Sequence, residues 1–596
     1  MFLTKLKTLF KKAPASRRRK KNALTLSCLQ QQVKERGLNA LIVTRNNRFL
    51  EEDILPEENL LRHLTDFSGS AGRLLVLPEG NSILFVDGRY ELQAALEVPS
   101  KVTVNCTATK LSFPDWLKYK LPAYPAKIGF NPWCVSIQEI EKLQHDVPRC
   151  QFVPVTGLDD DRRLSSKTFS VFAHDIEYAG VSTEEKLSEL FAENSFQGID
   201  TLLITAADSV SWLMNLRTRC LPDTPVLRAW ALVGSDGNIT LFADNGDFSQ
   251  ISASQFTLRS FAELPGELKK LRKKRLGLEM STAPYQLKSL ADQYDIALID
   301  TPDACAEMKC RKNPIELSGI RQAHICDGIA LTRFLIWLNQ QKPEKLSEKI
   351  VVDKLRSFRE KQKLFFSDSF STIAAFAEHG AIVHYHPGAE AECPFSAGSL
   401  LLLDSGAQYY NGTTDVTRTL AIGEPHQELI DACTYVLKAH IRLSSAVFPI
   451  GTPGIKLDVL SREELWKHGM DYNHGTGHGV GCFLNVHEGP VGISSSYSQT
   501  GLEQGMILSI EPGYYAENRY GIRIENLVEV VSAAPGMLTF SPLTLVPYDR
   551  CLINPKLLDT SEINWLNAYH ERVRETLSPL LSVKEKQELE KLCTRI

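Results

Sequence analysis

The sequence lacks the features that would place it among membrane, secreted or disulfide-rich proteins. No stretch approaches the roughly eighteen consecutive apolar residues that a membrane-spanning helix requires. The 13 cysteines include no Cys-x-x-Cys pair, and an odd number in so long a chain does not indicate a disulfide framework. The first 21 residues lack the apolar core of a secretory signal. We therefore expect a cytoplasmic protein with no membrane span.

Acidic residues are also missing from the first 21 residues, which carry nine Lys or Arg. Because the whole chain has a formal net charge of −4, the remainder is acidic, which argues against a core that binds nucleic acid. We interpret residues 1–22 as a solvated, disordered tail. The alternatives are a segment that targets an organelle, or an arm that touches anionic lipid or nucleic acid.

At 596 residues the chain is too long for one hydrophobic core, because cores stop growing at about 250–300 residues. Hydrophobic residues make up 43% and charged residues 23%, which is typical of folded globular proteins and argues against a disordered chain. We therefore expect several folded domains.

One order of helical and strand patterns occurs twice. The first copy has a predicted helix at 27–36 and predicted strands at 38–43, 73–77 and 82–86. The second copy has a predicted helix at 183–193 and predicted strands at 200–204, 229–233 and 239–242. Helix and strand alternate in both copies, which predicts two related α/β domains.

Two turn-like segments mark the predicted domain boundaries. Residues 159–163 are all charged, and Lys312-Asn313-Pro314 precedes a long helical pattern whose apolar face is interrupted around Asp327-Gly328. The predicted division is a basic tail at 1–22, α/β domains at 23–165 and 166–312, and a third domain at 313–596.

Two aspartates lie on neighbouring strands that should form a hairpin. Asp404 ends an apolar strand, and Asp415 lies in a β-branched strand that follows. A turn at Asn411-Gly412 would leave these two carboxylates about 13 Å apart. A bend near Tyr409-Tyr410 would instead place them face to face, where divalent cations would offset their repulsion. The sequence is compatible with both registers.

Further chemistry follows downstream. Residues 474–481 contain two histidines and four glycines, which excludes a stable helix and predicts a loop or a strand with close backbone approaches. Glu511 ends another apolar strand. The alternating pattern of 520–528 puts Arg523 and Glu525 on one strand face, where they need internal partners.

Four carboxylates and one imidazole therefore form a candidate ligand set. Hard oxygen ligands with a single nitrogen suit Mn²⁺, and also Zn²⁺ or Co²⁺. Two cations would balance four negative charges, so we predict a binuclear centre whose natural product is a bridging hydroxide able to attack a carbonyl group. The predicted metal ligands are Asp404, Asp415, His478, Glu511 and Glu525.

A specific set of motifs agrees with this interpretation. The segments are Phe67–Gly72, Val86–Tyr90, Leu403–Tyr409, Thr414–Thr419, His474–Gly481, Phe483–Pro490, Glu511–Tyr515 and Gly521–Asn526. They resemble the pita-bread metallopeptidases, the family of methionine aminopeptidase and prolidase, and within it the three-domain cytosolic Xaa-Pro aminopeptidases (aminopeptidase P). The resemblance runs from about residue 24 to the C-terminal helix. It implies two creatinase-like α/β domains followed by a pita-bread catalytic domain.

The resemblance also implies a role for each site residue. Asp404 would chelate one cation, and Asp415 and Glu525 would bridge both. His478 and Glu511 would complete the second site, with Glu511 as the general base and acid that carries a proton from the nucleophile to the departing proline nitrogen. Four further residues would bind substrate or anchor the carboxylates, namely His384, His474, His487 and Arg523.

The implied activity is hydrolysis of the N-terminal Xaa-Pro bond of peptides with proline at the second position, by a homodimer. The Xaa-Pro amide has no N–H, so a shallow apolar slot can prefer it without reading a hydrogen bond. Two alternatives stay open: prolidase or another relative with the same ligands, and a catalytically inactive protein that binds a partner. The second should have lost ligands, whereas this chain retains all five.

One segment departs from the family pattern. Residues 374–380 replace a Gly-rich, Asn-containing stretch that is expected before His384. Because of this departure, the family pattern does not predict the conformation of this loop or its effect on substrate preference.

Overall fold

The computed structural model describes most of the chain and divides it into two compact units. The described residues are 24–121, 125–157, 167–192, 197–252, 255–385, 392–495 and 499–596, and the predicted tail at 1–22 lies outside them. Unit 1 comprises residues 1–173, 183–221 and 226–305, and unit 2 comprises residues 174–182, 222–225 and 306–596. The domain boundaries proposed from the sequence stay predictions.

Unit 1 contains two six-stranded sheets of the same plan. The first has the order β4 (Val102–Cys106), β3 (Ser82–Val86), β2 (Arg73–Val76), β1 (Ala40–Thr44), β5 (Ala126–Phe130), β6 (Cys150–Pro154). The second has the order β13 (Thr257–Arg259), β11 (Ile239–Ala243), β10 (Ala229–Gly234), β8 (Thr201–Ile204), β14 (Arg275–Leu278), β15 (Ala297–Asp300). A central strand, β1 or β8, pairs antiparallel on one side and parallel on the other in both sheets. The predicted pair of related α/β domains is therefore confirmed.

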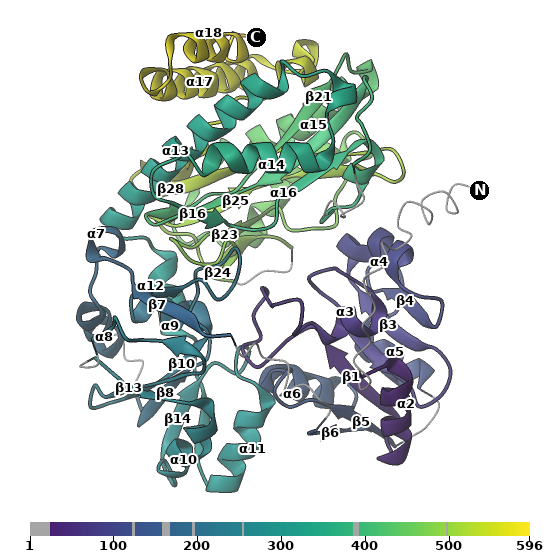
Figure 1. Ribbon diagram of the computed structural model, residues 1–596, viewed down its shortest axis with the longest axis vertical. Helices are drawn as coiled ribbons and strands as arrows, with labels where there is room; N and C mark the ends of the chain where they lie inside the picture. The colour runs from purple at the N-terminus through teal and green to yellow at the C-terminus, as the bar shows by residue number, and fades with distance from the viewer. Residues whose placement is uncertain are drawn as a thin grey trace. The chain divides into compact units, whose positions relative to one another are not determined.

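Burial on both faces explains why the sheet strands are continuously apolar. In β1, Leu41 and Val43 belong to one core cluster, while Ala40 and Ile42 belong to another. Successive side chains of a strand point to opposite faces, so both faces of the first sheet are packed. Helices lie alongside the two sheets (Figure 1). They include α2 (Leu26–Glu35), α3 (Leu60–Thr65), α4 (Glu91–Glu97), α5 (Phe113–Lys120), α6 (Ile137–Asp146), α8 (Thr183–Ala192), α9 (Ala207–Leu213), α10 (Leu264–Lys269) and α11 (Tyr285–Tyr294).

Unit 2 is built on a long helix, α13 (Pro314–Leu338), which begins where the sequence predicts. Asn313 caps the helix and forms a capping box with Glu316, and Pro314 occupies the first turn. Figure 1 shows α13 and α14 (Glu348–Arg359) alongside the strands of this unit. The other helices of unit 2 include α15 (Gln427–Ser444), α16 (Asp458–Trp466), α17 (Thr560–Leu577) and α18 (Val583–Leu592).

The sheets of unit 2 carry the candidate site. Two three-stranded sheets have the orders β16 (Phe365–Asp368), β19 (Ala407–Tyr409), β20 (Gly412–Thr413) and β17 (Ile373–Phe376), β18 (Ser399–Ser405), β21 (Val416–Ile422). A six-stranded sheet has the order β22 (Val447–Pro449), β29 (Met537–Pro542), β28 (Asn526–Ala534), β25 (Ile507–Ile510), β23 (Gly477–Gly479), β24 (Glu488–Ile493). A two-stranded sheet pairs β26 (Gly513–Ala516) with β27 (Tyr520–Arg523).

The register of the hairpin differs from both sequence alternatives. Tyr409 pairs with Gly412, so the turn residues are Tyr410 and Asn411, and Asp404 pairs with Thr417. This register lies midway between the two predicted ones. Asp415 is therefore two residues from the partner of Asp404, which brings both carboxylates to the same end of the hairpin.

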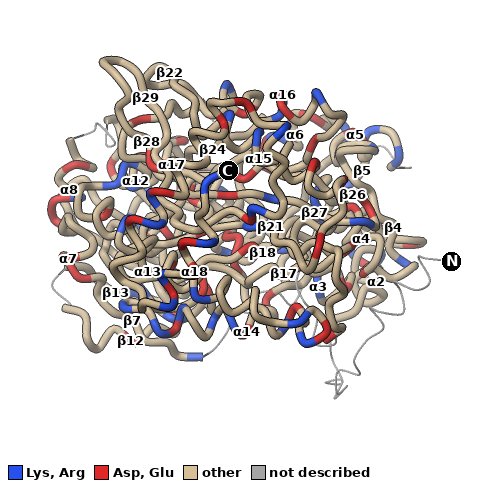
Figure 2. Tube along the Cα trace, turned by 90° about the horizontal axis from the view of Figure 1, so that it is seen from above, with Lys and Arg blue, Asp and Glu red and all other residues tan. Residues whose placement is uncertain are grey.

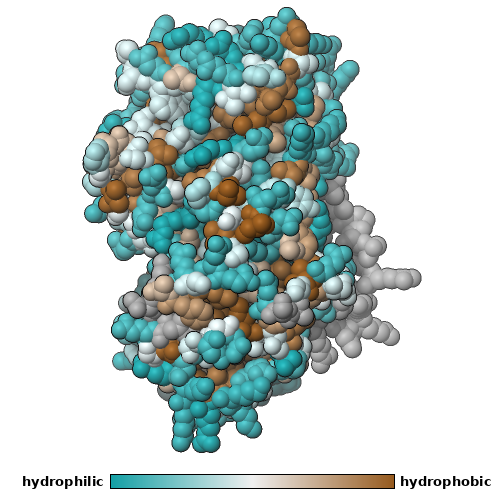
Figure 3. All heavy atoms as spheres, turned by 90° about the vertical axis from the view of Figure 1, so that its left-hand side faces the viewer, coloured by the Kyte–Doolittle hydropathy of each residue, from teal (hydrophilic) through white to brown (hydrophobic). Residues whose placement is uncertain are grey.

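Charged residues of both signs are spread along the chain. Figure 2 shows segments bearing Lys or Arg interspersed with segments bearing Asp or Glu. The face seen in Figure 3 is largely hydrophilic, with hydrophobic side chains gathered in small separate patches. Within the described ranges, no helix combines the length and the apolar character needed to cross a membrane. The cysteines of the described ranges form no disulfide bonds.

Candidate metal centre

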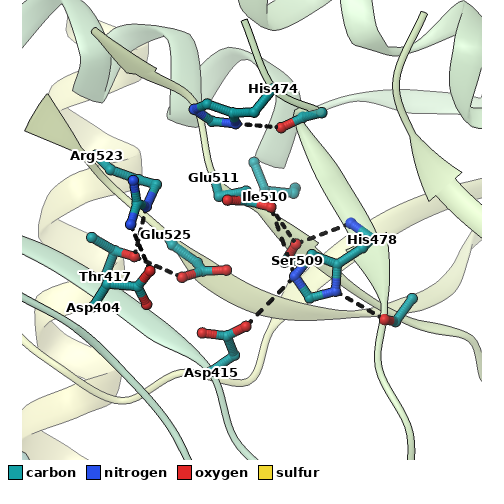
Figure 4. A network of polar contacts seen from close by, with 12 residues as sticks. Asp404, Asp415, Thr417, His474, His478, Ser509, Ile510, Glu511, Arg523 and Glu525 are labelled. Atoms are coloured by element: carbon teal, nitrogen blue, oxygen red, sulfur yellow. Dashed lines mark hydrogen bonds and ion pairs between the residues drawn. The ribbon is translucent and has the colours of Figure 1, made fainter. Parts of the chain in front are cut away.

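Strand ends deliver the five predicted ligands to one place. Figure 4 shows their side chains converging from separate strands. Asp404 lies in β18, Asp415 directly before β21, His478 in β23, Glu511 directly after β25, and Glu525 between β27 and β28. Residues far apart in the sequence thus meet because several short strands end at the same point.

The distances between the side chains suit a shared cation. One ligand atom from each of Asp415, His478 and Glu525 lies within 4.8 Å of the other two. The Nε2 atom of His478 is 3.5 Å from Asp415 Oδ2 and 3.7 Å from Glu511 Oε1. These separations are too long for hydrogen bonds and leave space between the ligand atoms.

The carboxylates have only part of the hydrogen bonding that buried charges need. Arg523 Nη2 donates to Asp404 at 2.6 Å, and Thr417 Oγ1 donates to Glu525 at 2.8 Å. The Oδ1 atoms of Asp404 and Asp415 are buried without a hydrogen-bond partner among the residues that the structure describes. A buried carboxylate oxygen without a partner is costly unless a cation takes its charge. These residues therefore fit a divalent metal centre.

The electrostatics of the cluster give the same result. Burial raises the pKa of Glu525 well above its usual range, and the charges of Asp415, Glu511 and Asp404 raise it further. Burial also raises the pKa of Asp404 and Glu511, against the opposing charge of Arg523. Four carboxylates in one small volume repel one another. Divalent cations between them would lower all of these pKa values.

Close backbone packing explains the glycines around His478. A Cβ atom at Gly477 would lie 1.9 Å from Ser509 O, and one at Gly479 would lie 2.2 Å from Glu488 O. Strand β23 lies between β25 and β24, and the backbone packs so closely at Gly477 and Gly479 that neither position has space for a side chain. The predicted strand with close backbone approaches is confirmed.

The other predicted site residues surround the ligands. His474 Nε2 is 2.8 Å from Tyr515 Oη, which accepts a hydrogen bond from Arg523 Nη1 at 2.7 Å. The His487 ring packs edge-to-face on the His478 ring, with centroids 4.3 Å apart. His384 follows Val383, whose carbonyl oxygen accepts from Arg523 at 3.4 Å. These three histidines are half-buried or exposed, whereas His478 is buried. The role of each residue stays a prediction.

Supporting residues were not identified from the sequence. Tyr515 and Thr417 orient Arg523 and Glu525, although hydroxyl side chains in strands give no signal that separates them from ordinary β-formers. Ser509 Oγ lies 3.5 Å from Glu511 Oε1 and accepts from the backbone N–H of His478.

A buried ion pair explains the interrupted apolar face of α13. Asp327 accepts from Arg359 at 2.8 and 3.0 Å, from Tyr409 Oη at 3.0 Å and from Thr414 Oγ1 at 3.1 Å. Thr414 directly precedes Asp415. The interruption thus supplies a fully paired carboxylate that holds the segment carrying a predicted ligand.

Family models match four segments of the chain. The creatinase/prolidase N-terminal domain matches residues 26–164 and again residues 162–316. Metallopeptidase family M24 matches residues 318–532, and the C-terminal region of that peptidase matches residues 536–596.

Similar proteins align over nearly the whole chain. Xaa-Pro aminopeptidase 1 of Dictyostelium discoideum is 34% identical over 592 residues, which cover 93% of each chain. An uncharacterized peptidase of Schizosaccharomyces pombe is 34% identical over 594 residues, 95% of this chain and 98% of its own. The X-prolyl aminopeptidase of Caenorhabditis elegans, described as a cytosolic enzyme with a di-nuclear active site, is 32% identical. Its crystal structure matches with a TM-score of 0.87 and covers 100% of this chain and 99% of that one. The chain therefore belongs to metallopeptidase family M24, in the group of relatives named Xaa-Pro aminopeptidases.

Proposed function

We propose that the protein is a metal-dependent aminopeptidase that hydrolyses the N-terminal Xaa-Pro bond of peptides. The observation that carries this proposal is the convergence of four carboxylates and one imidazole. Two of the carboxylates, Asp404 and Asp415, each have a buried oxygen without a hydrogen-bond partner in the described part of the chain. Membership of family M24 and the names of the similar proteins support the same reaction.

Five residues would hold two divalent cations. They are Asp404, Asp415, His478, Glu511 and Glu525, and a set rich in oxygen suits Mn²⁺ best, with Zn²⁺ or Co²⁺ as alternatives. When bound, the two cations would act as Lewis acids that make a water nucleophile available near neutral pH and polarise the carbonyl group of the substrate. The di-nuclear active site of the C. elegans relative supports the number of cations.

Glu511 is the proposed proton carrier. Its side chain is 20% exposed, against 5% for Asp415, so solvent reaches Glu511 more readily. A carboxylate at this position is able to accept a proton and then release it, as a general base and acid must. It would take the proton of the nucleophile and pass it to the departing proline nitrogen.

Four other residues would bind substrate or hold the ligands in place. Arg523 neutralises Asp404 and holds Tyr515, which contacts His474. His474, His487 and His384 are accessible, so they are placed to contact the peptide and to stabilise negative charge on the carbonyl oxygen.

We also propose the cytoplasm as the compartment, with support from the description of the C. elegans relative as a cytosolic enzyme. The homodimer stays a prediction.

Peptide length separates this function from that of prolidase. We expect cleavage of Arg-Pro-Pro and longer Xaa-Pro peptides, and no cleavage when the second residue is alanine, because a secondary amide carries an N–H that the apolar slot leaves unpaired. The measurement is kcat/KM for Gly-Pro, Arg-Pro-Pro and Arg-Ala-Pro with the metal-loaded enzyme. Hydrolysis of Gly-Pro without hydrolysis of Arg-Pro-Pro would contradict an aminopeptidase and favour prolidase.

A further inference from the structure

The segment that departs from the family pattern is held by a buried carboxylate on α14. Glu348 Oε1 accepts from the backbone N–H of Phe376 at 2.9 Å and lies 2.6 Å from His379 Nδ1. Its Oε2 atom accepts from Tyr385 Oη at 2.6 Å. The rings of His379 and Tyr385 stack with centroids 4.6 Å apart. We name Glu348, His379 and Tyr385 the Glu348 clamp.

The clamp closes both ends of the turn that carries His384. His379 lies before it in the sequence, and Tyr385 directly follows it. Between them, the backbone at Gly380 packs against Gly521 so closely that a Cβ atom on Gly521 would lie 1.7 Å from Gly380 O. Ala377, at the start of this turn, has a φ of 53°, which non-glycine residues adopt only where their surroundings hold them.

The same turn touches the candidate metal centre through one residue. Arg523 donates to the carbonyl oxygen of Val383 and pairs with Asp404. The turn is thus fixed on one side by α14 and on the other by β27. The position of His384 relative to the metal ligands depends on both attachments.

We propose that the Glu348 clamp positions His384 for the reaction. This proposal rests on the proposed function, because it assigns the clamp to the substrate side of that site. The members of the clamp are positioning residues, since none of them is a predicted ligand.

The chemistry of the clamp favours a fixed turn. Burial lowers the pKa of His379, but the hydrogen bond with Glu348 and the negative charges of Glu348 and Glu378 together raise it above its usual value. An imidazolium paired with a buried carboxylate forms a charge-assisted hydrogen bond, which is stronger than a neutral one. Breaking it would leave Glu348 buried with an unpaired charge, so the turn should loosen.

The test is a double-mutant cycle with His384. His379→Phe keeps an aromatic ring that is able to stack but removes the hydrogen bond, whereas His379→Asn keeps a side-chain N–H donor for Glu348. We expect His379→Phe to lower kcat/KM for an Xaa-Pro peptide by about 10- to 100-fold, since small misplacements of catalytic groups cost this much. In a His384→Ala background the same change should cost less than about threefold, because the clamp acts through His384. His379→Asn should stay within about threefold of wild type.

Three readouts keep the outcome decisive. Metal content of the His379→Phe variant should match wild type, and hydrogen exchange should quicken in residues 376–385 but not in residues 404–422. The exposed His145→Phe serves as control, and Tyr385→Phe takes the place of His379→Phe in the cycle if that variant does not fold. Equal losses in both backgrounds, or unchanged exchange at 376–385, would overturn the proposal. Failure of the wild type to cleave Xaa-Pro peptides would refute the proposed function instead, while the exchange comparison would still decide whether the clamp holds the turn.

Discussion

Asp415→Asn is expected to lower kcat/KM for an Xaa-Pro peptide by about 1,000-fold or more, because it would remove the negative charge of a proposed ligand of both cations. The folded chain should survive, since Asp415 Oδ1 has no hydrogen-bond partner among the described residues. Asp415 also raises the pKa of Glu525 by repulsion. The metal-free variant should therefore melt at the same temperature as metal-free wild type or above it. Kinetics, thermal melting and bound metal per chain together check this result.

The matched control for that variant is Asp353→Asn, which makes the same chemical change at an exposed position of α14. It should keep wild-type kinetics and metal content. A purified, folded Asp415→Asn enzyme with wild-type kcat/KM would show that Asp415 is not a ligand.

Glu511→Gln is expected to lower kcat by about 100- to 10,000-fold, the usual range for losing a general acid or base. The glutamine side chain keeps an oxygen atom that is able to bind a cation. Unlike a carboxylate, however, it is unable to take up a proton. The loss should thus fall mainly on kcat, and metal content should fall less than in Asp415→Asn. Because the amide does not titrate, the residual activity should also lose the part of its pH profile that Glu511 would set.

Glu517→Gln is the control for this second variant, because Glu517 is exposed and only six residues downstream. It should leave kcat and the pH profile unchanged. If the Glu511→Gln enzyme retains the full kcat, another group must transfer the proton. The first candidates would then be His384, His474 and His487.

Local patterns account for the parts of the fold that the sequence predicts. Continuous apolar runs predict β1 and β8 because these strands are buried on both faces, and Asn313 with Pro314 predicts the start of α13 because caps act within one turn. The convergence of the candidate carboxylates was also predictable, since carboxylates at the ends of apolar strands need partners.

Long-range geometry accounts for what the sequence does not predict. The hairpin register depends on which residues form the turn. The observed turn, which pairs Asp404 with Thr417, is displaced by one residue from each of the two predicted turns, in opposite directions. The alternating run 520–528 suggests one strand, but Ile524 and Glu525 form a break between β27 and β28. There Glu525 donates its backbone N–H to Thr417 O of the hairpin, a contact that spans distant segments.

The supporting side chains illustrate the same point. Asp327 looks in the sequence like a defect in an apolar helix face, although it pairs with Arg359 and Thr414. Similarly, His379 looks like a departure from the family pattern, although it bonds to Glu348 on another helix. Neither pairing has a local signal, because the partners come together only when the chain folds.

The most direct test of the account counts the divalent cations that one chain binds. Native mass spectrometry of Mn²⁺-loaded wild type, before and after removal of the metal with a chelator, should find two ions and then none, with Xaa-Pro cleavage lost and restored in parallel. Asp415→Asn should bind fewer than two. Full Xaa-Pro cleavage by the metal-free chain, or two ions retained after Asp404, Asp415 and Glu525 are all replaced by their amides, would contradict the proposed metal centre.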